Sequence, residues 1–198
     1  MLIEETVVPD NALPVAEFRN HLRMGSGFGD DNLQDAVLLS FLRAALSAIE
    51  ARTGKILFER GFLWSLTKWQ GVDAQALPVA PVTALSRVTL VARDATETDI
   101  DLTTLRLVRN IQQPCIVALG TALPTIPQNG GVDIRFSAGW GPTWGDLPSD
   151  MAQAVLLLAA HYYEFRSETS LSEGCMPFGV SSLIERYRTV RVGFGGGK

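Results

Sequence analysis

Residues 148–166 read PSDMAQAVLLLAAHYYEFR and contain the longest apolar run of the chain, from residue 154 to residue 160. Pro148 suits the first position of a helix, and Asp150 suits the positive end of its dipole. The positions that recur at helical spacing are Ala152, Val155, Leu156, Ala159, Tyr163 and Arg166. Because apolar residues nearly surround residues 154–160, we expect this helix to be buried on most sides, in a bundle or beneath a sheet.

A second long helix is expected between residues 30 and 53. Asp30 or Asp31 can cap its start, and Gly54 is well placed to stop it. Its predicted apolar face comprises Leu33, Val37, Phe41, Ala45, Ala48 and Arg52, widened by Leu38, Leu42 and Ile49. A face of this width predicts two neighbouring elements rather than one.

Two shorter helices are expected at residues 14–24 and 177–188. The four helices together predict a helical core. We place the centres of its two main apolar faces at Phe41 and Leu156, because each lies midway along its stripe.

The middle third of the chain changes to the alternating, β-branched pattern that is typical of strands. The predicted strands are residues 62–69, 86–92, 105–108, 115–118 and 132–137, separated by Gly, Pro, Asn and Asp. We expect one antiparallel unit of about five strands, with residues 77–82 as an extended connector. The predicted fold class is therefore α+β, with two long helices, shorter ones and an inserted β unit.

The 198 residues are expected to form a single domain. Residues 62–138 are its β-rich insertion, and residues 189–198 are a flexible tail in which strand-like residues precede a glycine run. Residues 1–54 carry eight acids and four bases, a net charge of −4, whereas residues 183–198 carry four bases and one acid, a net charge of +3. In a self-assembling protein, such complementary ends steer encounter and fix register.

The composition excludes several classes of function. Hydrophobic residues at 46% and charged residues at 19% indicate a folded protein, and the net charge of −4 provides no broad cationic surface for nucleic acid or lipid. The apolar run is too short to span a membrane, and the acidic start, MLIEE, is unlike an export signal. Cys115 and Cys175 lie sixty positions apart, which indicates reduced thiols rather than a disulfide framework.

We recognise no catalytic, cofactor-binding or metal-binding constellation in the sequence. His161 and Glu164 have a spacing that can share a metal, but a bundle site needs that pattern twice, and the chain has two histidines. No GxSxG motif is present. The glycine runs at residues 25–29 and 193–197 lack the context of nucleotide-binding loops. We therefore expect neither an enzyme nor a cofactor.

Trp140 and Trp144 are candidate interface residues in the segment AGWGPTWG, residues 138–145. Tryptophans are frequent anchors of protein interfaces. The alternative is a turn whose tryptophans cover the core between the last strand and the helix, and the sequence favours neither reading. Arg186, Arg188 and Arg191 are expected to meet an acidic protein surface rather than phosphate.

Five segments in a fixed order carry a family resemblance: IEARTGK at residues 49–55, LPVAPV at 77–82, RFSAGWG at 135–141, AHYYE at 160–164 and MPFGVSSLIERYR at 176–188. Together they resemble the head-tail connector, or adaptor, proteins of long-tailed bacteriophages and phage-like gene transfer agents. The resemblance covers nearly the whole chain. One departure is Arg186, at a position where the family pattern leads us to expect proline.

The resemblance implies a structural protein that forms a twelvefold ring beneath the portal and links the DNA-filled head to the tail or to a stopper ring. DNA would pass through the lumen without sequence-specific binding. The implied place is the neck of a virion or virus-like particle, assembled in the bacterial cytoplasm. The resemblance also implies that the C-terminal segment binds the portal, with Arg186, Arg188, Val190, Arg191, Val192 and Phe194 as candidate contacts. The alternatives are another neck or tail-completion subunit, or a small hydrolase or ligand-binding domain.

Overall fold

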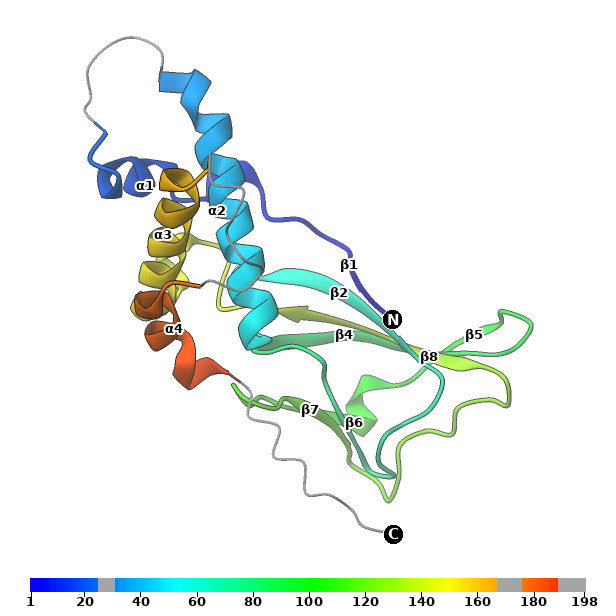
Figure 1. Ribbon diagram of the computed structural model, residues 1–198. Coiled ribbons are helices and arrows are strands. Elements are labelled where there is room, and N and C mark those ends of the chain that lie inside the picture. The colour runs from blue at the N-terminus through cyan, green and yellow to red at the C-terminus, as the bar shows by residue number, and fades with distance from the viewer. Residues whose placement is uncertain (25–30, 167–175, 189–198) are drawn as a thin grey trace.

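The computed structural model describes residues 1–24, 31–166 and 176–188, and these ranges form four α-helices and eight β-strands. The helices gather at one end of the molecule and the strands at the other (Figure 1). The predicted α+β class is therefore confirmed. The tail predicted at residues 189–198 lies outside the described residues.

The helices are α1 (Val15–His21), α2 (Asp31–Thr53), α3 (Ser149–Glu164) and α4 (Phe178–Ile184). α2 has 23 residues and α3 has 16, whereas α1 and α4 have seven each. α3 packs against the other three helices, which explains why its sequence is apolar on nearly every side. Short 3-10 helices accompany this layer, namely η1 (Asp10–Ala12), η3 (Trp144–Asp146) and η4 (Glu185–Tyr187).

α2 ends at Thr53, directly before Gly54, as predicted, and Gly54 has a φ of 68°. This left-handed conformation is unfavourable for residues with a Cβ. The buried side chains of α2 are Leu38, Leu42, Ala45, Leu46, Ile49 and Thr53. The predicted face was centred wrongly, since Phe41 is half-buried and Val37 is 46% exposed. Leu38, Leu42 and Ile49, which we expected only to widen the face, lie at its centre.

α3 begins one residue after Pro148. Its buried side chains are Met151, Ala154, Val155, Leu158, Ala159 and Ala160, whereas Leu156 is half-buried. The prediction that Leu156 is the centre of the face is therefore wrong, and Leu158 takes that position. A segment that is apolar on all sides does not indicate which side is most deeply buried, so the neighbouring helices decide it.

The larger sheet has five antiparallel strands in the order β1-β2-β8-β4-β5. They are β1 (Leu2–Glu4), β2 (Arg60–Leu66), β4 (Val82–Val91), β5 (Glu97–Asp99) and β8 (Gly131–Ala138). Strand β8 is central and alternates strictly, with Val132, Ile134, Phe136 and Ala138 buried. Phe62 of β2 pairs with Phe136, and their rings stack with centroids 5.7 Å apart.

A second sheet has three antiparallel strands in the order β3-β7-β6. They are β3 (Ala74–Ala76), β6 (Leu105–Val108) and β7 (Cys115–Ala118). The expectation of one unit of about five strands is therefore corrected to sheets of five and three strands. Alternation marks a strand but does not name its pairing partner, and β1, β3 and β5, of three residues each, are too short to show a pattern.

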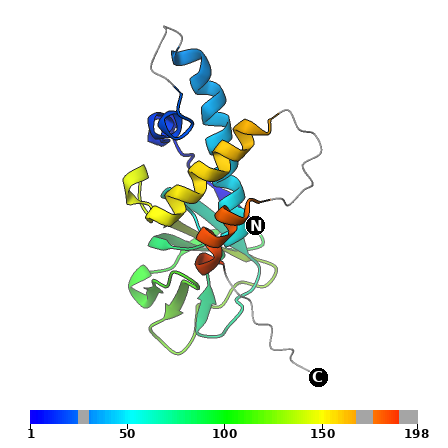
Figure 2. The ribbon, with the colours of Figure 1, turned by 60° about the vertical axis from the view of Figure 1, so that its left-hand side comes forward.

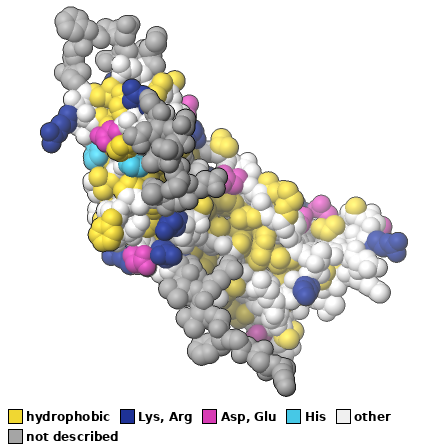
Figure 3. Space-filling view, viewed as in Figure 1, with side chains coloured by type: hydrophobic (Ala, Val, Ile, Leu, Met, Phe, Trp, Pro, Cys, Tyr) yellow, Lys and Arg dark blue, Asp and Glu magenta, His cyan; other side chains and the backbone are white. Residues whose placement is uncertain are grey.

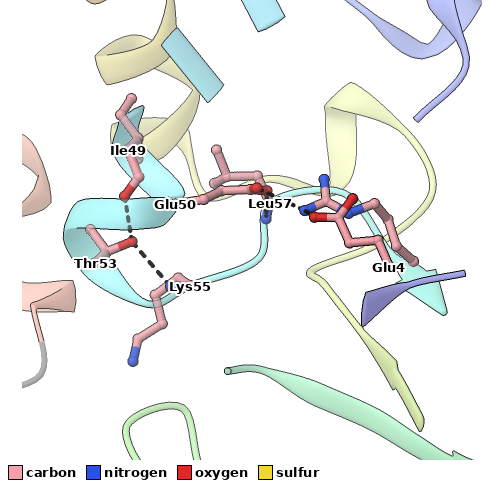
Figure 4. A network of polar contacts seen from close by, with 7 residues as sticks. Glu4, Ile49, Glu50, Thr53, Lys55 and Leu57 are labelled. Atoms are coloured by element: carbon pink, nitrogen blue, oxygen red, sulfur yellow. Dashed lines mark hydrogen bonds and ion pairs between the residues drawn. The ribbon is translucent and has the colours of Figure 1, made fainter. Parts of the chain in front are cut away.

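Residues 55–60 join the helices to the sheets. Ile56 is buried in the core of the sheets, whereas the next two residues, Leu57 and Phe58, are buried in the core of the helices. Across this junction, the Glu50 carboxylate of α2 accepts hydrogen bonds from the Leu57 amide at 2.8 Å and from Arg60 at 2.7 Å (Figure 4). Arg60 also reaches Glu4 of β1 at 3.2 Å. This network holds the end of α2 against the larger sheet.

Candidate assembly surface

α4 and η4 form an amphipathic unit that packs on α3. Val180, Ile184 and Tyr187 recur at helical spacing and are all buried. Phe178 is off this stripe, and it is 87% exposed. The unit is therefore held by one face and presents the opposite face, including a large aromatic side chain, to solvent.

Tyr187 holds this unit to the start of α3. Its hydroxyl donates to the Asp150 carboxylate at 2.8 Å and accepts a hydrogen bond from Arg186. Arg186 also forms an ion pair with Asp150 at 2.8 Å. Burial raises the pKa of the Tyr187 hydroxyl, and its bond to Arg186 opposes that rise. The cluster fixes the end of η4 while leaving the Arg186 side chain 68% exposed.

A second polar chain ties η4 to the smaller sheet. Gln112 donates to the Arg186 carbonyl at 3.1 Å and accepts a hydrogen bond from the Lys55 ammonium at 3.2 Å. Lys55 is 1% exposed, and burial lowers the pKa of its ammonium group. A substitution of Lys55 or Gln112 would therefore remove a contact between the helices and the smaller sheet.

Two of the candidate portal contacts lie in the described residues. Arg186 binds Asp150 and Tyr187, and Arg188 pairs with Glu185 at 3.1 Å. Both arginines lie on η4 or directly after it. The other four candidates, Val190, Arg191, Val192 and Phe194, lie outside the described residues.

The structure places Trp140 and Trp144 against the helical core, and both are partly buried. Trp140 meets Tyr187 edge-on with ring centroids 6.1 Å apart, and Trp144 stacks on Phe58 at 6.4 Å. Trp140 Nε1 is buried without a hydrogen-bond partner in the described part of the chain. The two tryptophans therefore cover the core, and each leaves part of its ring accessible.

Exposed apolar side chains also lie near the N-terminus. Met1 is 80% exposed and Ile3 of the edge strand β1 is 41% exposed, and Figure 3 shows hydrophobic side chains over this part of the larger sheet. Figure 3 also shows hydrophobic, basic and acidic side chains together over α4. The α4 surface was missed by the sequence analysis. The available signal was Phe178, which directly follows Pro177 and does not fit the apolar spacing of Val180 and Ile184.

Within residues 1–24, 31–166 and 176–188, no three His, Cys, Asp or Glu side chains come together in a way that could hold a metal ion. His161 instead packs against Phe165, with ring centroids 4.7 Å apart. None of the helices in these ranges combines the length and apolarity that crossing a bilayer requires.

Three solved structures contain chains similar to this one, each over 98% of both chains. A chain in the neck of an empty gene transfer agent particle, computed with C6 symmetry, is 54% identical with a TM-score of 0.91. A chain in the virion of a native gene transfer agent is 53% identical with a TM-score of 0.86, and a chain in a native neck computed with C12 symmetry is 51% identical with a TM-score of 0.85. The chain belongs to this family of gene transfer agent neck proteins.

No family model and no curated protein sequence matches the chain. The relationship to gene transfer agent neck proteins therefore rests on the solved structures, whose sequences are similar from end to end. The predicted resemblance to phage-like neck proteins is confirmed at this level. The neck protein is a structural component of a virus-like particle.

Proposed function

We propose that this neck protein is the head-tail adaptor, a ring-forming subunit that lies between the portal and the tail or stopper ring. The observation that carries the proposal is 51–54% identity, over 98% of the chain, to chains from gene transfer agent particles, two of which are from necks computed with C6 and C12 symmetry. Identity of this extent along the whole chain supports a place in the neck, and the resemblance of the sequence motifs to adaptor proteins favours the adaptor among the neck subunits. A twelvefold ring is the expected state in the particle.

Two features of the chain support a ring around a DNA channel. Rings form when two different surfaces of one subunit meet and the rotation between copies closes. The sequence supports such a difference, since residues 1–54 and 183–198 carry opposite net charges. The net charge of −4 for the whole chain favours passage of DNA over adhesion to it.

A second candidate is another subunit of the same neck, such as a stopper or tail-completion protein. The similar chains are described as parts of a neck or of a virion, which fits more than one ring of that region. The order of the rings in the particle separates the two candidates. An adaptor contacts the portal directly, whereas a stopper does not.

The portal contact is proposed to be made by Arg186, Arg188 and the four candidates that follow them, Val190, Arg191, Val192 and Phe194. Arg186 is held by Asp150 but keeps a side-chain exposure of 68%, so a second acidic partner can reach it. Arg188 is 45% exposed and follows η4 directly. The acidic partner is expected on the portal surface.

The test is a chain that lacks residues 189–198, mixed with portal-bearing heads of the same particle and cosedimented. We expect unchanged circular dichroism and melting temperature, and loss of attachment to the heads. Normal attachment with a collapsed melting temperature would show that these residues are an integral part of the fold and that the portal is bound elsewhere.

A matched pair of substitutions separates a specific contact from a general charge effect. Arg191→Glu is expected to weaken attachment to the heads, because it places an acid against the proposed acidic surface. Arg93→Glu makes the same change of charge at an exposed position after β4 and is expected to leave attachment unchanged. Equal loss in both variants would contradict a local contact of the C-terminal segment.

A further inference from the structure

Phe178 is the most exposed of the large hydrophobic side chains in the described residues, at 87%. It opens α4, whose buried residues Val180 and Ile184 hold the helix firmly on α3. A Phe side chain buries roughly 150 to 250 Å² when it enters an apolar site. This surface therefore presents a fixed aromatic side chain that no described part of its own chain covers.

A surface pocket of about 620 Å³ lies between the N-terminal segment and η3. Residues of apolar or aromatic character that line it include Pro9, Leu13, Pro14, Pro142 and Trp144. Trp144 is backed by Phe58, which fixes its ring, and Leu13 and Pro14 are buried. The pocket is therefore preformed and has the volume to take one aromatic side chain.

The pocket and Phe178 lie on different sides of the helical layer. Figure 2 shows α1 and η3 on one side of α3 and α4 on the other. A side chain and a pocket so placed cannot meet within one subunit, but each can meet the other on a neighbouring copy. This is the arrangement that a head-to-tail contact requires, and such contacts close into rings.

The two segments carry opposite excesses of charge, and part of that charge is paired within the subunit, where Arg186 meets Asp150 and Arg188 meets Glu185. The segments that line the pocket, residues 9–17 and 142–146, contain Asp10, Glu17 and Asp146 and no Lys or Arg. All three acids are exposed; Asp10 is paired with Arg43, and Asp146 accepts hydrogen bonds from Thr143. Residues 178–188 carry Arg186 and Arg188 against one acid. Complementary charges of this kind orient two copies before the apolar contact forms.

We infer that Phe178 of one copy inserts into the Pro- and Trp-lined pocket of the neighbouring copy, and that this contact repeats around the ring. The inference rests on the proposed ring and adds its interface. Trp144 is then an interface residue through the accessible part of its ring, while its other contacts remain in the core. The occupant of the pocket is a second copy of this chain.

The direct test replaces Phe178 by the photo-crosslinking residue p-benzoylphenylalanine in the full chain, in cells that assemble particles. Purified particles are irradiated, and the crosslinked peptides are identified by mass spectrometry. We expect a crosslink to residues 9–17 or 142–145 of another copy. A crosslink to a different protein, to another part of the chain, or to nothing would overturn the interface.

This readout separates the inference from the proposed function. If the particles carry the chain at the neck but give a different crosslink, only the proposed interface is contradicted. The wild-type chain is expressed in parallel, and particles that lack the wild-type chain contradict the proposed function itself. The wild-type control also gives the amount of chain expected per particle.

Two substitutions test the contact from either side. Phe178→Ala removes the inserted side chain, and Val72→Ala, at a position 75% exposed among residues of the sheet half, is the matched control. Gly145→Phe adds a bulky side chain at a residue that lines the pocket, and a Cβ at Gly145 meets only the Thr143 hydroxyl at 3.9 Å, so we expect the free subunit to tolerate it. We expect both interface variants to keep the wild-type melting temperature and to reduce incorporation into particles at least tenfold. Wild-type incorporation of both would overturn the inference.

Discussion

Leu156 and Leu158 show how far two positions in one helix can differ. Both are leucines of α3, yet Leu158 is 0% exposed and Leu156 only packs against the edge of the core. The same holds on α2, where Leu42 is fully buried and Phe41 instead meets Tyr163 edge-on at 5.9 Å. Burial of the individual side chain, rather than its hydrophobicity, sets its contribution to stability.

We expect Leu158→Ala to lower the free energy of unfolding by about 3 to 4 kcal/mol, since a fully buried leucine leaves a cavity on truncation. Leu156→Ala is the matched control and is expected to cost at most half as much. Urea denaturation of both variants measures the difference. Equal costs would show that α3 is rotated from the orientation described.

The Glu50 carboxyl makes the free energy of unfolding depend on pH. Burial raises its pKa above the usual 4.5, while Arg60 and the Leu57 amide partly offset the rise. The folded chain therefore holds this proton more tightly than the unfolded chain does. Stability from this group is present below the unfolded pKa and falls as the pH rises through the folded pKa.

We therefore expect the difference in unfolding free energy between wild type and Glu50→Gln to shift against wild type as the pH rises above about 4.5, and then to level off. Urea denaturation between pH 4.5 and 8 measures it, with the exposed Glu164→Gln as control. A difference that stays constant, or that moves in favour of wild type, would contradict the raised pKa.

At the scale of the elements, two glycines lie in surroundings that differ in one respect. Neither Gly54 nor Gly179 has an atom within 4 Å of the place where a Cβ would stand. Gly54, however, ends α2 with a φ of 68°, whereas Gly179 lies inside α4 with helical backbone. The effect of adding a side chain on the free energy of unfolding therefore differs between the two sites only through the backbone conformation.

Gly54→Ala is expected to lower the free energy of unfolding by about 1 kcal/mol, because L residues are strained in the left-handed region. Gly179→Ala is expected to be neutral or to stabilise by up to about 1 kcal/mol, because alanine favours helix. Thermal unfolding followed by circular dichroism checks both. The same sign of change in the two variants would contradict this account.

On the scale of the whole molecule, one chain builds two hydrophobic cores, one among the helices and one between the sheets. The junction at residues 55–60 contributes to both, and the Glu50–Arg60 and Lys55–Gln112 contacts cross it. These side-chain contacts, together with the backbone, join the two halves of the molecule. Its outward surfaces remain available for contacts with other chains.

We expect the purified chain to contain no stoichiometric zinc or iron, and its melting temperature to be unchanged by a chelator. The reason is that the whole sequence offers two histidines and two cysteines, none of them with ligand spacing. Elemental analysis with and without chelator measures this. One equivalent of zinc or iron would revive the alternative of a small hydrolase.

The sequence by itself determined the α+β class, the stop of α2 at Gly54, the start of α3 near Pro148 and the presence of a strand at residues 132–137, which is β8. Each of these depends on local chemistry: a glycine that adopts positive φ, a proline that favours helix starts, and strict alternation over eight residues. The order of motifs also carried the resemblance to neck proteins. These signals are local, so they can be recognised from the sequence without knowledge of the fold.

Only the tertiary structure decided which side of α3 is deepest, how eight strands divide into two sheets, and what remains at the surface. The spacing of apolar residues does not distinguish Leu156 from Leu158, although only Leu158 is fully buried. A strand of three residues, such as β1, is too short to show an alternating pattern. In the sequence, Phe178 is one apolar residue among others, and only the structure shows that it is exposed. Burial and pairing depend on contacts between residues far apart in the chain, and local pattern does not contain that information.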